Sequence, residues 1–164
     1  MKKDKKIKEL DTWLKNANDD DFSENSSSYS KDIIHDKFDY TFEDILNIDD
    51  NYGIFEFKRN GVQDYVLNKL KKTSEASIAS VIDLHGETVK DAINILDNFF
   101  VNSYKNNVEH IKIICGKGTN SKDKVPKIKI TCQAFIKKSQ FVNAACSAKD
   151  NEGGVGVIKV KLKN

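Results

Sequence analysis

The sequence has no long hydrophobic run and few cysteines. None of its apolar stretches approaches the roughly 20 residues that a membrane-spanning helix needs, and no charged-then-apolar leader stands at its start. The three cysteines form no Cys-x-x-Cys pair and do not cluster with histidines at the spacing of a zinc site. These absences predict a cytoplasmic protein with reduced thiols, no membrane association and no structural metal.

Charge is present in abundance but is distributed unevenly. The formal net charge of +2 over 164 residues conceals an acidic first part and a basic second part. Residues 1–61 contain 10 Lys and Arg against 15 Asp and Glu, whereas residues 62–164 contain 17 against 10. A basic domain behind an acidic leader suits a polyanionic partner, although a solvated lysine-rich surface gives the same composition.

The first 60 residues have little that can form a core. Residues 2–15 favour a short amphipathic helix, and residues 16–32 are polar, acidic and serine-rich, as in disordered segments. Residues 43–46 favour another short helix, and the aromatic segment 52–57 is either a short strand or a docking loop. We therefore expect an N-terminal extension over residues 1–60, largely disordered, that tethers the protein to a partner.

Hydrophobic periodicity predicts regular structure from residue 61 onward. Residues 61–78 have the apolar spacing of a linker helix, and residues 79–164 alternate strand and helix patterns. Helices are expected after the capping box at residues 88–91 and from Pro126. Strands are expected at residues 79–85, 110–115, 141–148 and 155–162. The order β-α-β-α-β-β predicts an α/β two-layer sandwich, a four-stranded mixed sheet with helices on one face, preceded by an extra N-terminal helix.

Two polar motifs stand at the ends of the first two expected strands. Ile82-Asp83-Leu84-His85-Gly86 ends the first, and Cys115-Gly116-Lys117-Gly118 ends the second. A helical crossover predicts that these strands are parallel neighbours. Both motifs would then meet at one edge of the sheet, where ligands of open α/β sheets collect.

The residue types at this edge suit phosphate chemistry. His85 titrates near neutrality and can exchange a proton with a reacting oxygen, while Asp83 can orient the imidazole or raise its pKa. Glycine amides and a helix N-terminus favour an anion, and Lys117 adds a positive charge. Each motif is weak alone, since an Asp-x-His pair is more often structural and no P-loop signature is present. Their order and spacing together favour a phosphate-handling site.

Several independent motifs follow one another between residues 79 and 163. They are Ile82–Gly86 with Thr88, Ile113–Gly118 with Ser121, and Gly153-Gly154-x-Gly156. In this order they resemble the Smr (small MutS-related) domain family, and residues 61–70 resemble the helix that precedes the domain in stand-alone bacterial endonucleases of the SmrA and SmrB type. The resemblance implies an endonuclease that cleaves RNA, notably messenger RNA at stalled or collided ribosomes, or that nicks DNA.

The resemblance also implies roles for individual residues. The family's Asp-x-His motif maps onto Asp83 and His85, and its glycine-rich motif maps onto residues 115–118. Cys115 stands where many bacterial members have His, which leaves His85 as the general acid–base candidate. We therefore expect Asp83, His85 and Lys117 to be catalytic, and the nucleic-acid phosphate to be bound by Gly86, Gly116, Gly118, Ser121, Lys122 and Lys124.

The leading expectation is a metal-independent endoribonuclease in which the 2′-hydroxyl of the substrate attacks phosphorus. It needs no cofactor, with Mg²⁺ bound by Asp83 only in the case of DNA nicking. RNA and the ribosome are the expected partners, DNA is a further one, and the protein is expected to be a monomer. The alternatives are a non-catalytic nucleic-acid or ribosome-binding module and a DNA-nicking endonuclease of repair or recombination.

Overall fold

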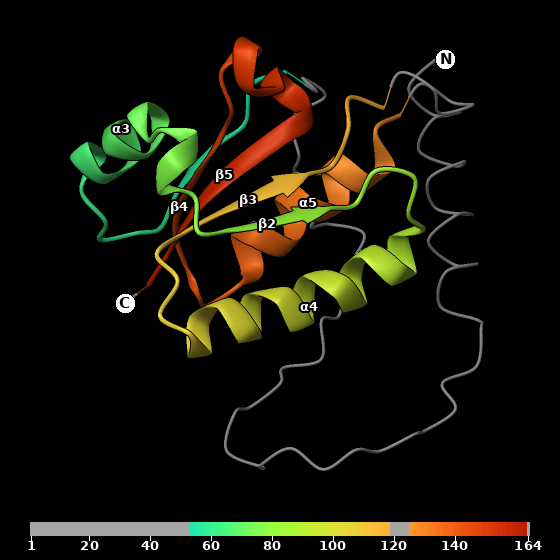
Figure 1. Ribbon diagram of the computed structural model, residues 1–164, viewed down its shortest axis with the longest axis horizontal. Coiled ribbons are helices and arrows are strands. Elements are labelled where there is room, and N and C mark those ends of the chain that lie inside the picture. Colours follow the sequence, from blue (N-terminus) through green and yellow to red (C-terminus); the bar gives the residue numbers. More distant parts are fainter. Residues whose placement is uncertain (1–52, 119–124, 164) are drawn as a thin grey trace. The chain divides into compact units, whose positions relative to one another are not determined.

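Strands and helices alternate along residues 53–118 and 125–163, which are the residues that the computed structural model describes (Figure 1). The strands are β1 (Glu56–Lys58), β2 (Ser80–Asp83), β3 (His110–Ile114), β4 (Val142–Ser147) and β5 (Val157–Leu162). The α-helices are α3 (Asp64–Lys72), α4 (Val89–Lys105) and α5 (Lys127–Lys138), and short 3-10 helices cover Glu75–Ser77, Asp150–Glu152 and Gly154–Gly156. From β2 onward, this is the predicted β-α-β-α-β-β succession, and α3 is the helix expected before it.

The strands form one mixed five-stranded sheet in the order β1-β4-β5-β3-β2. Strands β2 and β3 are parallel, as a helical crossover predicts, and all other neighbours are antiparallel. The expectation of four strands is corrected to five in the described residues, because β1 joins the sheet at its edge and pairs Glu56 with Cys146 of β4. The aromatic segment before residue 58 thus leads into a strand.

Residues 53–60 were expected to belong to the N-terminal extension, but they are tied to the sheet. The buried Phe55 donates its N–H to Ser147 Oγ at 2.9 Å. Arg59 donates from its Nε to the Val142 carbonyl oxygen at 2.8 Å. Residues 56–58 thus contribute a strand to the sheet before the domain boundary that is expected after residue 60.

The helices cover the two faces of the sheet unequally. On one face Leu70 of α3 packs with Ala144 and Cys146 of β4, and all three side chains are buried. Strand side chains alternate between faces, so the fully buried cross-strand partners Ile113 and Ile158 point to the opposite face. Helices α4 and α5 lie on that side (Figure 1). The two helices expected to share a face do so, and α3 adds a partial third layer.

Helix α4 links the two strands that carry the candidate motifs. Its start is fixed by Thr88, whose Oγ1 accepts a hydrogen bond from the Asp91 N–H at 3.2 Å, as the capping box predicts. Leu96 and Phe100, four residues apart on one face of the helix, are fully buried. The Phe100 ring lies 5.1 Å from the Phe135 ring of α5, so aromatic contact holds the two helices together.

Residues 1–52, 119–124 and 164 lie outside the described residues. The helices expected at residues 2–15 and 43–46 fall there, as do three of the proposed phosphate-binding residues, Ser121, Lys122 and Lys124. Within the described ranges, no helix is both long enough and apolar enough to cross a membrane.

Candidate active site

The Asp-x-His motif lies at the carboxyl end of the edge strand β2. Asp83 is the last residue of the strand, and its partner on β3 is Ile114. The next residue, Leu84, is fully buried, and its N–H donates to the Ile114 carbonyl oxygen at 2.7 Å. This anchor leaves Asp83 and His85, on either side of Leu84, exposed to solvent. The apolar residue holds the strand end while the two polar ones project from it.

Asp83 and His85 form a directly hydrogen-bonded pair. The distance from His85 Nδ1 to Asp83 Oδ1 is 2.7 Å, and the backbone N–H of His85 donates to the same oxygen at 3.1 Å. Because a carboxylate only accepts, this geometry assigns the Nδ1 proton to the hydrogen bond and leaves Nε2 for other partners. The His85 side chain is 74% exposed, so a substrate can approach it from solvent.

The pair also shifts the titration of both groups. Burial raises the pKa of Asp83, but the hydrogen bonds and the charge of His85 outweigh it and lower the pKa below its ordinary value. The hydrogen bond to Asp83, followed by the charge of that carboxylate, raises the pKa of His85. Both shifts have the same cause, because the imidazolium and the carboxylate stabilise each other. Asp83 therefore orients the ring and favours its protonated form.

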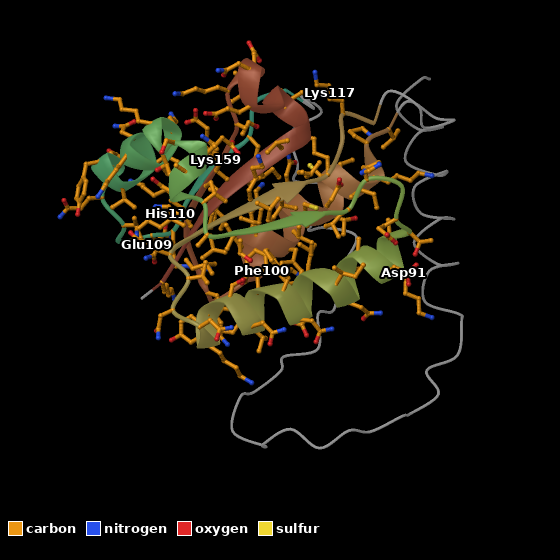
Figure 2. The ribbon with its side chains drawn as sticks, in the orientation of Figure 1. Asp91, Phe100, Glu109, His110, Lys117 and Lys159 are labelled. Atoms are coloured by element: carbon orange, nitrogen blue, oxygen red, sulfur yellow. The ribbon has the colours of Figure 1, made fainter. Side chains whose placement is uncertain are left out.

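The glycine-rich loop after β3 reaches the same edge, as the parallel strand order predicts. A Cβ atom placed on Gly116 would lie 3.7 Å from the His85 Cβ, so the loop backbone passes directly beside the histidine. Gly116 has a φ of +74°, a conformation that glycine adopts without strain. Lys117 follows it and is exposed, on the segment that leaves β3 (Figure 2). The structure thus places Asp83, His85 and Gly116 side by side.

A third segment, the turn Gly153–Gly156, holds this loop in place. The Gly156 carbonyl oxygen accepts hydrogen bonds from the N–H groups of Cys115 and Gly116, both at 3.0 Å, and from Cys115 Sγ at 3.2 Å. A Cβ on Gly156 would lie only 3.0 Å from Lys117 Cγ and 3.1 Å from the Lys117 nitrogen. Only glycine fits this approach without displacing the loop. In the sequence these glycines contributed solely to the family resemblance, and their packing role was not predicted.

The backbone of the loop corrects one expected role. Gly116 was expected to offer its N–H to a phosphate, but that N–H already donates to the Gly156 carbonyl oxygen. Its role in this structure is to let the chain pass close to His85. Cys115 is buried at 5% exposure, which agrees with its expected place as a small core residue.

Gly118 and Gly86 each serve the course of the chain. Gly118 has a φ of +71°, and a Cβ there would lie 2.5 Å from the Cα of Pro126, the residue before α5. Gly86 has a φ of +81° with open space around it, and it turns the chain away from His85 toward α4. The start of α4 lies at the same end of the molecule as the carboxyl ends of β2 and β3 (Figure 1).

A metal site would need several side chains with ligand atoms grouped around one point. Asp91 stands in the first turn of α4, where its carboxylate accepts from the Thr88 hydroxyl at 2.6 Å. In residues 53–118 and 125–163, no three His, Cys, Asp or Glu side chains are grouped so that they could hold a metal ion.

Known proteins resemble this chain in sequence. The model of the Smr domain family matches residues 82–163, half of the chain. An Endonuclease MutS2 from Staphylococcus carnosus is 28% identical over 106 residues, which cover 65% of this chain and 13% of that protein. A Probable DNA endonuclease SmrA from Escherichia coli is 27% identical over 108 residues, covering 66% of this chain and 57% of that protein. The chain therefore spans only a part of each of these relatives.

The fold has a counterpart among solved structures. YdaL, a stand-alone small MutS-related protein from Escherichia coli, matches with a TM-score of 0.59 at 24% identity, covering 68% of this chain and 84% of that chain. At this level of identity the likeness concerns the fold. The residues that match the family include the Asp83–His85 pair and both glycine segments, 116–118 and 153–156. This chain belongs to the Smr domain family.

Proposed function

We propose that this chain is an endonuclease that cleaves RNA, with His85 as the proton-transferring group. The observation that carries the proposal is the 2.7 Å hydrogen bond between Asp83 and an imidazole whose side chain is 74% exposed. Such a pair is a general acid–base group within reach of a polymer substrate. The names of the relatives, Endonuclease MutS2 and Probable DNA endonuclease SmrA, support a nuclease in general.

RNA contains its own nucleophile, so a single well-placed imidazole is sufficient to start the reaction. Neutral His85, with its Nδ1–H bonded to Asp83, accepts the proton of the 2′-hydroxyl at Nε2. The 2′-oxygen then forms a bond to phosphorus while the bond from phosphorus to the 5′-oxygen breaks, and the 5′-oxygen takes up a proton from water. The products carry a 2′,3′-cyclic phosphate and a 5′-hydroxyl. Acting as the acid instead, protonated His85 gives its Nε2 proton to the leaving 5′-oxygen.

Lys117 is proposed to stabilise the charge that develops on the phosphate oxygens. It follows Gly116, which lies against His85, and its side chain is exposed. A positive charge fixed beside the reacting phosphate favours the transition state more than the ground state. Gly86, Gly118, Ser121, Lys122 and Lys124 remain the proposed contacts to the phosphate backbone, and Gly116 shapes the loop.

The remaining features of the proposed function concern its setting. The protein is proposed to act in the cytoplasm as a monomer, without a cofactor, on messenger RNA at stalled or collided ribosomes. Its acidic N-terminal residues are proposed to provide the tether to the ribosome, because the small domain has little surface of its own with which to choose among RNAs.

Cleavage of one RNA and of the matching DNA, each with and without EDTA, tests the proposal. His85→Ala should lower RNA cleavage by about 10²–10⁴-fold, because general acid–base catalysis contributes that much, and should leave RNA binding largely intact. The wild-type protein should remain active in EDTA and leave 2′,3′-cyclic phosphate ends. His110→Gln is the matched control, since His110 begins β3 at the opposite end of the strand. Equal losses of binding and cleavage in His85→Ala would contradict a catalytic role.

DNA nicking is the second candidate, and the name of the SmrA relative is the observation that favours it. In that reaction water is the nucleophile, so a nicked plasmid and 5′-phosphate ends would replace the proposal with DNA hydrolysis. Failure to cut either nucleic acid, together with salt-sensitive binding, would instead indicate a binding module.

A further inference from the structure

We propose that the buried ion pair between Lys159 and Glu152 is a positioning element for the candidate active site. It fixes the turn Gly153–Gly156, and through that turn it fixes the Gly116–Lys117 backbone beside His85. This inference rests on the proposed function, because positioning is defined by the reaction that the site performs.

Lys159 is an unusual residue for the middle of a sheet. It belongs to β5, is completely buried, and lies close to α3 (Figure 2). Its Nζ donates to the Thr73 carbonyl oxygen at 2.8 Å and is 2.5 Å from Glu152 Oε2. A buried ammonium is strongly destabilising unless it is paired and hydrogen-bonded. The Lys159 ammonium therefore holds the Thr73 carbonyl oxygen and the Glu152 carboxylate firmly. The ion pair thus determines the position of Glu152.

Glu152 connects this pair to the glycine turn. It ends the 3-10 helix Asp150–Glu152, directly before Gly153, and its side chain is only 12% exposed. The Gly154 N–H donates to the Lys149 carbonyl oxygen at 2.9 Å, and the Glu152 N–H donates to the same oxygen at 2.8 Å. The start of the turn and Glu152 are thus bonded to the same Lys149 carbonyl oxygen, and the Glu152 carboxylate pairs with Lys159 of β5.

The other end of the turn contacts the glycine-rich loop after β3. The Gly156 carbonyl oxygen accepts from the N–H groups of Cys115 and Gly116, and the Gly156 Cα approaches Lys117 so closely that an added Cβ would push the loop away by a few tenths of an ångström. Downstream, Val157 begins β5. The turn is therefore held on one side by the sheet and on the other by Glu152. Loss of the contact at Glu152 leaves Gly156 free to shift, and the loop beside His85 shifts with it.

Replacement of the two partners in the full chain tests this inference. Glu152→Gln removes the carboxylate with little change in shape, and we expect kcat for RNA cleavage to fall about 10-fold or more while KM changes less, because displacement by about 1 Å can cost about 10²-fold. Lys161→Met is the matched control: Lys161 is two residues further along β5 and pairs with Glu109 at the surface, so kcat should not change.

The double variant separates positioning from folding. Lys159→Met leaves the Glu152 carboxylate unpaired and should lower the unfolding midpoint, and the addition of Glu152→Gln should recover much of that loss. If the pair positions the loop, kcat stays low in the double variant although stability recovers. If kcat recovers together with stability, or if Glu152→Gln has the wild-type kcat, the inference is overturned.

A readout that does not depend on cleavage distinguishes this inference from the proposed function. The N–H groups of Cys115 and Gly116 are bonded to Gly156, so their hydrogen exchange should be about 10-fold faster or more in Glu152→Gln and unchanged in Lys161→Met. A wild-type protein that cleaves no RNA would contradict the proposed function alone. Unchanged exchange at both amides in Glu152→Gln would contradict the role of the pair.

Discussion

Gly118→Ala should destabilise the protein far more than a substitution at an ordinary glycine turn. An alanine at a φ of +71° costs about 1–2 kcal/mol because its Cβ crowds the backbone. In addition, its Cβ would lie 2.5 Å from the Cα and the Cβ of Pro126, and backbone atoms at the start of α5 cannot rotate away. Overpacking of this kind adds about 1–3 kcal/mol, so the free energy of unfolding should fall by about 2–5 kcal/mol.

Gly61→Ala is the matched control for this change. Gly61 has a φ of +86° and no atom within 4 Å of the added Cβ, so only the conformational cost of about 1–2 kcal/mol applies there. Urea unfolding of both variants, followed by circular dichroism, measures the two losses. Equal losses would refute the close approach of Gly118 to Pro126. Gly118→Ala should also reduce RNA cleavage under conditions where it is folded, whereas Gly61→Ala should not.

Two further predictions concern the Asp83–His85 pair and helix α4, which follows it. Asp83→Asn removes the charge that raises the pKa of His85, so the NMR titration midpoint of His85 should move to lower pH, and the pH dependence of cleavage should move with it. A midpoint that stays in place would show that Asp83 does not perturb the imidazole. Thr88→Ala removes the cap of α4 and should lower the free energy of unfolding in urea by about 0.5–2 kcal/mol, and an unchanged value would show that the capping bond does not stabilise the helix.

Much of the fold could be predicted because local signals and topology agree. The capping box at Thr88 and the apolar spacing of Leu96 and Phe100 determine α4 without reference to other parts of the chain. A helix between two strands makes them parallel neighbours, and this alone brings His85 and Gly116 to one edge. The convergence of the two motifs was therefore predictable from their order in the sequence.

The parts that escaped prediction depend on contacts between distant residues. A short strand was one of the two interpretations of residues 52–57, but the pairing of the three-residue β1 with β4, about ninety positions later, has no local signal. The Gly116 N–H is used by Gly156, a partner that spacing along the chain does not indicate. Lys159 has the pattern of a solvent-facing residue in an alternating strand, and only Thr73 and Glu152 make its burial possible. Each of these features is a pairing of polar groups over a long range.

The exposure of the Asp83–His85 pair constrains how the site can work. Electrostatic effects are weak in water and become strong only where water is excluded, and the His85 side chain is 74% exposed. The protein alone therefore does not provide a dry environment for the reaction. A substrate that lies across the strand ends and covers Asp83 and His85 can exclude that water, and a polymer covers more of this edge than a single nucleotide does. The open geometry thus supports the proposal of a long nucleic acid as the substrate, which would cover the groups that the glycine loops place at this edge.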